Sequence, residues 1–281
     1  MNIHTATHFG MCFGVREALR RAHDSAASGP VTILGQLVHN PVVQEHLATL
    51  GVREGRLEEV GSVATQNVMI TAHGAADRDR AAWRDAGYRV TDTTCPLVHK
   101  AHAALAQLVA GGCQPVVIGQ RGHVEVRGLT GDFPGTVVVE SEADFPLLPA
   151  TPLYGVVSQT TQPIVRVRRI VAAMRLYVPG SEVRFRDTVC QPTKDRQTAM
   201  EELCSQCDVI IVVGGRHSNN TRQLAETARS RGVTAHQIET PSDLDPAWFR
   251  GCRDAGVTAG TSTLDETVRD VIQRLKEIGA A

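Results

Sequence analysis

One local unit recurs along the chain: a short run of β-branched residues, then a small polar turn, then a stretch with helical character. It occurs six times, in VTILGQLVHN, NVMITAHGA, QPVVIGQRGHVEVRG, LYGVVSQTT, DVIIVVGGRHSNN and GVTAGTSTLDE. Strands that are apolar throughout are typical of sheets covered by helices on both faces, and their alternation with helices indicates parallel pairing. The repeat therefore predicts an α/β fold built from parallel sheets.

The polar turns are predicted to form a binding site. Each lies where a strand leads into a helix, and ligands of open parallel sheets bind at that edge. The turns carry imidazole, hydroxyl, amide and carboxyl groups, namely those of His39, His73, His123, Glu125, Thr160, Ser218, Asn220 and Ser262. Purely structural turns would contain mostly Gly, Asp and Pro. We therefore expect these side chains to share one polar site.

Three of the seven cysteines have matching surroundings: GMCFGVREALRRA, DTTCPLVHKAHAAL and DTVCQPTKDRQTAM. In each, the cysteine directly precedes a helical stretch, and Pro96 or Pro192 stands in the first turn, where proline is tolerated. Since Cys12, Cys95 and Cys190 lie about a third of the chain apart, each is expected to belong to one of three α/β lobes. The predicted lobes are 13–95, 96–189 and 190–281, the last joined by the N-terminal segment 1–12.

A helix N-terminus lowers the pKa of a thiol, which makes a cysteine there a better metal ligand or nucleophile. Three such thiolates suit zinc with an open fourth position, or a [4Fe–4S] cluster with one iron that lacks a cysteine ligand. The spacing of the cysteines does not decide between zinc and a [4Fe–4S] cluster. Cys204 and Cys207 instead share the apolar stripe of a helix and are expected to pack in the core, and Cys113 and Cys252 have no expected function.

Charge and hydropathy exclude several classes of protein. The 29 basic and 30 acidic residues give a net charge of −1, which does not favour binding to nucleic acid or to an anionic membrane. The longest apolar run, Val209–Val213, is too short to span a bilayer, and MNIHTATHFG lacks the features of a secretion signal. An odd number of cysteines argues against a disulfide framework. We expect a cytoplasmic protein.

The motifs resemble those of one known family, the 4-hydroxy-3-methylbut-2-enyl diphosphate reductases, also called IspH/LytB. They run in order from Gly10 to about Val271: GxCxGV around Cys12, VHN at 38–40, AHG at 72–74, TCPLVxKxH at 94–102, GHxEVxG at 122–128, SQTT at 158–161, DTxC at 187–190, SxNTxxL at 218–224 and TAGTS at 258–262. The segments around Cys95 and around His123 and Glu125 are the most specific.

The resemblance implies a reductive dehydroxylation of an allylic alcohol diphosphate, giving isopentenyl and dimethylallyl diphosphate in the methylerythritol phosphate route to isoprenoids. It implies three lobes in a pseudo-threefold arrangement around a [4Fe–4S] cluster held by Cys12, Cys95 and Cys190. The electron donor would be a ferredoxin or flavodoxin with its reductase. Glu125, Thr160 and His123 would be catalytic, the first two forming the proton relay. The substrate would be bound by His39, His73, His123, Thr160, Ser218, Asn219, Asn220 and Ser262.

Some positions depart from the usual family pattern, and alternatives remain open. Val124, His217, Asn219 and the pair Gln191-Pro192 stand where other residues are common, which leaves room for a divergent paralogue acting on a related allylic substrate. A non-catalytic iron–sulfur redox sensor would leave Glu125 and the Ser/Asn turns unexplained. A zinc-dependent hydrolase would use the same three cysteines, and a brown protein that loses iron in air would exclude it.

Overall fold

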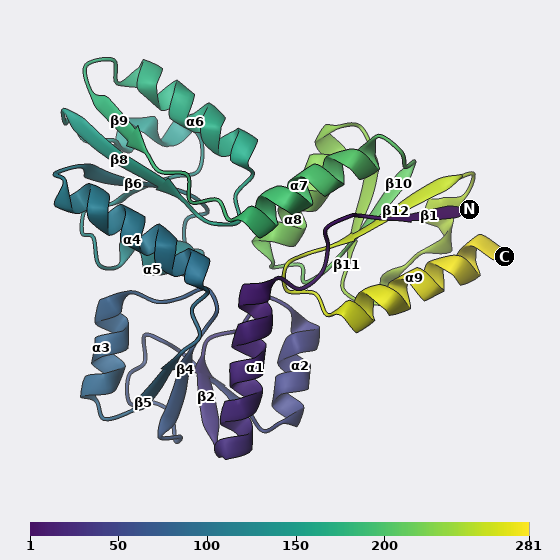
Figure 1. Cartoon of the computed structure of the whole chain (residues 1–281), viewed down its shortest axis with the longest axis horizontal. Coiled ribbons are helices and arrows are strands. Elements are labelled where there is room, and N and C mark those ends of the chain that lie inside the picture. Colours follow the sequence, from purple (N-terminus) through teal and green to yellow (C-terminus); the bar gives the residue numbers. More distant parts are fainter. Residues whose placement is uncertain (281) are drawn as a thin grey trace. The chain divides into compact units, whose positions relative to one another are not determined.

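The computed structural model describes residues 1–280, which form three four-stranded sheets with helices packed beside them (Figure 1). All strand pairs within these sheets are parallel. The predicted α/β class with three parallel sheets is therefore confirmed. Among the helices of residues 1–280, none is both long and apolar enough to cross a membrane.

The first sheet has the strand order β3-β2-β4-β5. Its strands are β2 (Val31–Leu34), β3 (Arg53–Gly55), β4 (Asn67–Ile70) and β5 (Arg89–Asp92). The chain places α1 (Phe13–Ser28) before this sheet, α2 (Pro41–Thr49) after β2, and α3 (Asp77–Asp85) between β4 and β5. Trp83 of α3 is fully buried and packs in one cluster with Leu34, Val68 and Ile70.

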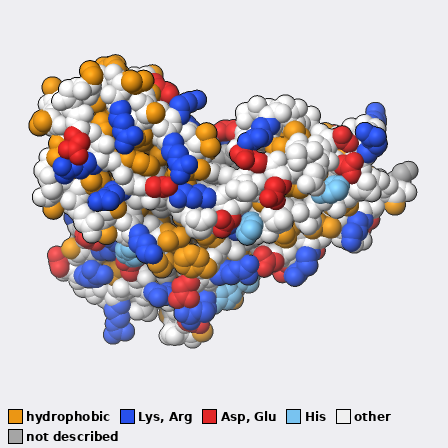
Figure 2. All heavy atoms as spheres, turned by 45° about the horizontal axis from the view of Figure 1, so that its top comes forward, with side chains coloured by type: hydrophobic (Ala, Val, Ile, Leu, Met, Phe, Trp, Pro, Cys, Tyr) orange, Lys and Arg blue, Asp and Glu red, His pale blue; other side chains and the backbone are white. Residues whose placement is uncertain are grey.

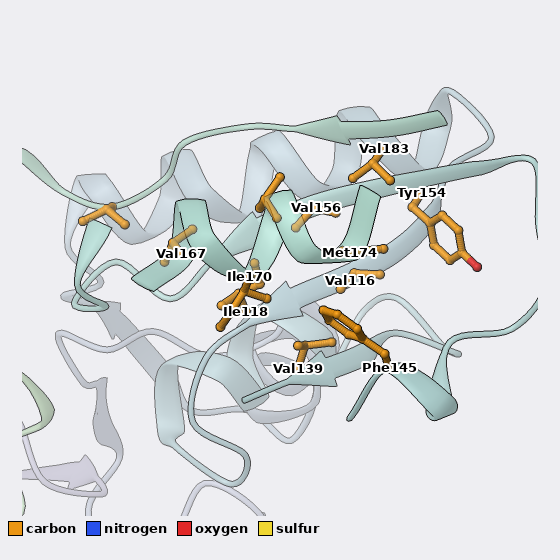
Figure 3. Packing of buried hydrophobic residues seen from close by; sticks show 12 residues of the cluster. Val116, Ile118, Val139, Phe145, Tyr154, Val156, Val167, Ile170, Met174 and Val183 are labelled. Carbon is orange, nitrogen blue, oxygen red and sulfur yellow. The ribbon is translucent and has the colours of Figure 1, made fainter. Parts of the chain in front are cut away.

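The second sheet has the order β7-β6-β8-β9. Its strands are β6 (Gln114–Ile118), β7 (Val137–Val139), β8 (Leu153–Ser158) and β9 (Glu182–Phe185). Helices α4 (Pro96–Ala110) and α5 (Val124–Thr130) cover one face, and α6 (Ile164–Tyr177) covers the other, next to the 3₁₀-helix η1 (Glu142–Leu147). In Figure 3, Val116, Ile118 and Val156 of the sheet pack with Ile170 and Met174 of α6.

The third sheet has the order β1-β12-β10-β11, so its edge strand β1 comes from the beginning of the chain. Its strands are β1 (Asn2–Thr5), β10 (Val209–Val213), β11 (Thr234–Ile238) and β12 (Asp254–Ala259). Helices α7 (Gln191–Cys204) and α8 (Asn219–Ser230) pack on one face and α9 (Asp265–Ala280) on the other. Two 3₁₀-helices, η2 (Pro241–Asp243) and η3 (Pro246–Phe249), follow β11.

Strand β10 explains why the central strands read as unbroken apolar runs. Val209, Ile211 and Val213 contribute to the core under α9, whereas Ile210 and Val212 contribute to the core under α7 and α8. Successive side chains of a strand point to opposite faces, so a strand covered on both faces must be apolar at every position.

The chain divides into two compact units. The first unit comprises Met1–Arg16, Val38–Thr49 and Gln191–Ala281, and the second unit comprises Glu17–Leu37 and Leu50–Cys190. The third sheet lies in the first unit, and the other two sheets lie in the second. The lobe boundaries at 95 and 189, and an arrangement of lobes around a cluster, stay predictions.

Candidate active site

Three cysteines occupy the same place in the three sheets. Each follows an edge strand (β1, β5 or β9) and immediately precedes a helix (α1, α4 or α7). The backbone N–H of each donates to the carbonyl two residues beyond the end of the adjacent strand: Cys12 to Thr261, Cys95 to Ala72 and Cys190 to Thr160, each at 3.0 Å. The predicted helix starts are thus confirmed, and the three sheets present equivalent cysteines.

The repeated D-T-[TV]-C sequence builds the same turn twice. The Asp92 carboxylate accepts the N–H of Thr94 at 3.0 Å, and that of Asp187 accepts the N–H of Val189 at 3.1 Å. In both turns the threonine after the aspartate donates its hydroxyl to a carbonyl at the end of the adjacent strand. These bonds fix the backbone before Cys95 and Cys190, because a short polar side chain can satisfy nearby backbone donors.

In the first unit, the loops after β10 and β12 meet the segment that carries His39. The Asn40 amide donates to the carbonyl of Ser262 at 2.8 Å. At Gly215, an added Cβ would lie 2.2 Å from the carbonyl oxygen of His39, so only glycine fits there. Because Cys12 donates to Thr261 in the same loop as Ser262, the unit gathers the segments of Cys12, His39 and Ser262.

The N-terminus of α8 supplies further polar groups at this edge. Ser218 caps the helix by accepting the N–H of Thr221 at 3.4 Å, and Asn219 accepts from the Arg222 guanidinium at 3.1 Å. Buried Asn220 is different, because its amide nitrogen Nδ2 has no hydrogen-bond partner within residues 1–280. The hydroxyl of buried Ser262 likewise has none in that part of the chain.

Unsatisfied buried polar groups are costly, and two of them lie at this edge: Asn220 in the first turn of α8 and Ser262 in the loop after β12. The N–H groups and positive end of a helix favour an anion. His39 adds an imidazole whose pKa is lowered by burial and by nearby His217, so the ring is mainly neutral near pH 7 and presents one N–H donor.

In the second unit, Glu125 is held by Thr160. Glu125 lies in the first turn of α5, is 1% exposed, and accepts the backbone N–H of Thr160 at 2.6 Å through Oε1. Burial raises the pKa of Glu125 to about 7, although the hydrogen bonds from the Thr160 N–H and hydroxyl act in the opposite direction. At neutral pH this carboxyl group therefore carries a proton in a large part of the molecules and can act as an acid.

His123 caps α5 immediately before Glu125. Its Nδ1 accepts the N–H of Glu125 at 3.1 Å, which places the proton of the neutral ring on Nε2. The ring of His73 lies 5.4 Å away, centroid to centroid, in an edge-to-face arrangement. The predicted residues His73, His123 and Glu125 are therefore neighbours at the carboxyl edges of β4 and β6.

Thr160 connects the acid to one of the cysteines. Its N–H donates to Glu125, and its carbonyl accepts the N–H of Cys190 at 3.0 Å. A single residue thus separates the buried carboxyl group from the loop that carries Cys190.

Two buried polar residues that hold these loops in place were not predicted. Asn40, which follows His39 in the VHN motif, is buried and holds the Ser262 loop. Arg80 is 5% exposed, lies 3.0 Å from the Asp92 carboxylate and donates to the Thr94 hydroxyl at 3.1 Å, so it braces the turn before Cys95. An arginine in a helix of mixed charge gives no sequence signal of such burial.

The other cysteines serve packing. Cys207 belongs to the core under α7 and α8, and Cys204 packs against that core, as predicted from their helical spacing. Burial, with nearby Asp254 and Asp208, raises the pKa of the Cys207 thiol to about 11, which disfavours the thiolate that metals bind. Cys113 is also buried in the core of the second sheet.

Comparison with known proteins assigns the family. The family model described as LytB protein matches residues 3–276. The chain is 35% identical to the 4-hydroxy-3-methylbut-2-enyl diphosphate reductase of Geobacter metallireducens, over 100% of this chain and 99% of that protein. It is also 35% identical to the reductase of Aquifex aeolicus, over 99% and 97% of the two chains.

Solved structures agree. The E-1-hydroxy-2-methyl-but-2-enyl-4-diphosphate reductase of Plasmodium falciparum superposes with a TM-score of 0.92 at 26% identity, covering 98% of this chain and 88% of that one. A second structure, of (E)-4-hydroxy-3-methyl-but-2-enyl diphosphate reductase, the terminal enzyme of the non-mevalonate pathway, has a TM-score of 0.70 at 34% identity, over 99% and 100% of the chains. The chain, with its three equivalent cysteines and its polar loops at the strand ends, belongs to the LytB family.

Proposed function

We propose that this chain reduces 4-hydroxy-3-methylbut-2-enyl diphosphate, removing the hydroxyl group as water and forming isopentenyl and dimethylallyl diphosphate, the terminal step of the non-mevalonate route. The full-length relatives named above are reductases of this substrate. The observation that supports the proposal most strongly is the buried Glu125, with a pKa of about 7, one residue away from the Cys190 loop. Breaking an allylic C–O bond needs an acid for the departing oxygen.

Cys12, Cys95 and Cys190 would hold a [4Fe–4S] cluster. The donor set fits, because all three cysteines are partly exposed, stand at helix starts, and follow equivalent edge strands. When bound, the cluster would pass electrons one at a time to the substrate. The chain itself supplies no reductant, so the electrons would come from a ferredoxin or flavodoxin with its reductase.

The polar loops would bind the diphosphate. Asn220 and Ser262 offer buried groups without a protein partner among residues 1–280, and the first turn of α8 offers backbone N–H groups. His39, Ser218 and Asn219 of the first unit, and His73 and His123 of the second unit, would supply further donors to the diphosphate. Local donors are needed because the net charge of the chain is only −1.

Glu125 would supply the proton to the substrate oxygen as it leaves as water. The Thr160 N–H would orient the carboxyl group, and the Thr160 hydroxyl would pass a proton between Glu125 and the substrate. His123 would direct its Nε2–H towards the substrate, because its Nδ1 is engaged by the backbone of Glu125. The balanced reaction consumes two electrons and two protons, breaks one C–O bond, forms one C–H bond and releases one water.

The test is an anaerobic assay of the iron-loaded protein with reduced methyl viologen and the hydroxymethylbutenyl diphosphate. Formation of isopentenyl and dimethylallyl diphosphate is expected, with two viologens oxidised per product. A protein that holds iron but leaves the substrate unchanged would instead be a redox sensor or a paralogue for another allylic substrate. Zinc in place of iron would contradict the proposal.

A further inference from the structure

The outer face of α6 is basic and partly apolar. The helix carries four arginines and no acidic residue. Its exposed positions follow helical spacing and include Val165, Arg168, Arg169, Arg175 and Leu176. Leu176 is 83% exposed and Val165 is 71% exposed, the two highest values among the large hydrophobic side chains of residues 1–280. Figure 2 shows Lys or Arg and apolar side chains side by side on the lobe at the upper left, which carries α6 in Figure 1.

The positive charge of this face is only partly neutralised. Arg166 donates to the carbonyl of Glu140 at 2.7 Å, and Arg169 lies 3.2 Å from the Glu142 carboxylate. Arg168 and Arg175 form no ion pair within residues 1–280. An exposed apolar side chain beside unpaired arginines is typical of a surface that binds an acidic protein.

The two ends of α6 differ in their distance from the Cys190 loop. The helix begins four residues after Thr160, so its first residue lies within about 14 Å of Thr160 even if the connection is fully extended. Thr160 holds the N–H of Cys190. Arg175 is seven residues beyond Arg168, about 10 Å farther along the helix.

We propose that Val165, Arg168 and Arg169, hereafter the α6 patch, form the docking surface for an acidic one-electron carrier protein. The proposal rests on the proposed reductase function, because that reaction needs two electrons from outside the chain. Each of two reduced carriers gives up one electron and leaves oxidised. The substrate takes both electrons and two protons, exchanges its C–O bond for a C–H bond, and releases water. The α6 patch is the part of the basic face that lies nearest the Cys190 loop, and electron transfer slows steeply with distance.

A charge-reversal pair on one helix tests the α6 patch. The binding of an oxidised acidic ferredoxin and of an acidic flavodoxin to the iron-loaded protein is measured by calorimetry at low and at physiological salt. Arg168→Glu should weaken carrier binding about tenfold, and the loss should shrink as salt increases. Arg175→Glu is the matched control, with the same charge change on an exposed, unpaired arginine. At physiological salt it should weaken binding less than about threefold, because its distance of about 10 Å from Arg168 along the helix exceeds the Debye length of ~8 Å.

Turnover gives the second readout. With reduced ferredoxin as donor, Arg168→Glu should lower kcat/KM about as much as it weakens binding, whereas turnover with reduced methyl viologen should not change. Arg168→Gln, which removes the charge and keeps the length of the side chain, should give a smaller loss in the same direction.

Four results would overturn the proposal: equal effects of Arg168→Glu and Arg175→Glu, no effect of Arg168→Glu, no binding of either carrier to the unsubstituted protein, or Arg168-dependent binding of phosphatidylserine vesicles without carrier binding. Failure of the proposed function has a different signature. The unsubstituted protein would then form no product with methyl viologen, while the calorimetric comparison of carriers and variants would still decide the docking surface.

Discussion

The backbone N–H of Thr160 donates to Oε1 of Glu125 at 2.6 Å, in a site where the carboxyl group is almost completely buried. The bond joins the loop after β8 to the first turn of α5, so the position of the acid depends on two strand ends of one sheet. The Thr160 hydroxyl also stabilises the ionised carboxylate, which opposes the effect of burial on the pKa. The chemistry of Glu125 should therefore respond to changes at Thr160.

Thr160→Val keeps the backbone N–H and removes the hydroxyl. Because that hydroxyl lowers the pKa of Glu125, its loss should move the pKa above about 7 and shift the alkaline limb of the rate profile to higher pH. The plateau rate should fall, since the hydroxyl would also relay the proton. The measurement is kcat with methyl viologen between pH 5.5 and 9. An unshifted alkaline limb would show that the hydroxyl does not act on Glu125.

Burial of Glu125 should also make stability depend on pH. Its pKa is raised from 4.5 to about 7, so the folded protein binds this proton more tightly than the unfolded chain does. The stabilising contribution of the protonated group is complete below pH 4.5 and is lost as the pH rises to about 7, a loss of roughly 3 kcal/mol.

Glu125→Gln cannot ionise and should lack this loss. Its free energy of unfolding relative to the unsubstituted protein should therefore increase between pH 5 and pH 8, as measured by urea denaturation at both values. Parallel pH dependence of the two proteins would contradict a buried, titrating Glu125.

Substitution of the three equivalent cysteines should remove the iron. Cys12→Ser, Cys95→Ser and Cys190→Ser each delete one of three expected thiolate ligands, so iron and sulfide per chain should fall well below the level of the unsubstituted protein. Cys204→Ser is the control, because this thiol packs beside the core instead. Full iron content in any of the first three variants would show that the substituted cysteine is not an iron ligand.

The unpartnered groups at the third sheet should contribute to substrate affinity. Asn220→Ala and Ser262→Ala should each weaken diphosphate binding about ten- to a hundred-fold, the value of a charge-assisted hydrogen bond of roughly 1.5–3 kcal/mol. Thr258→Val is a matched control, because its buried hydroxyl also has no partner within residues 1–280 but lies inside β12. Its affinity should not change. Equal affinity of the unsubstituted protein for the diphosphate and for its free alcohol would show that these residues bind no anion.

The sequence predicted the central strands and not the edge strands. The six recurring units correspond to β2, β4, β6, β8, β10 and β12, which occupy the middle positions of the three sheets. Most edge strands have no continuous apolar run; β7 (Val137–Val139) is the exception, with only three apolar residues. In β3 (Arg53–Gly55) and β5 (Arg89–Asp92), for example, no residue is fully buried. An edge strand is therefore recognised by its hydrogen bonds to a central strand, and the sequence pattern does not show these bonds.

The sequence predicted which residues form the site, but not how deeply they are buried or which contacts hold them. Glu125 alone has the appearance of a solvated carboxylate, and its burial arises only when α5 and the loop after β8 pack together. The steric requirement for glycine at position 215 depends on a segment that is more than 170 residues away in the chain. The buried Arg80 also depends on tertiary contacts, with Asp92 and Thr94. These features arise from packing between segments that are distant in the sequence, and a local motif does not predict such packing.

The role of Glu125 as proton donor is tested by an anaerobic single turnover of the iron-loaded protein and its Glu125→Gln variant with reduced methyl viologen. Glutamine preserves the size of the side chain and its hydrogen bond from Thr160, but it cannot supply a proton. The variant should keep its iron and its affinity for the substrate, while product formation should slow by about 10²–10⁴-fold. Product formation by Glu125→Gln within a few-fold of the unsubstituted rate would contradict the role of Glu125 as the proton donor.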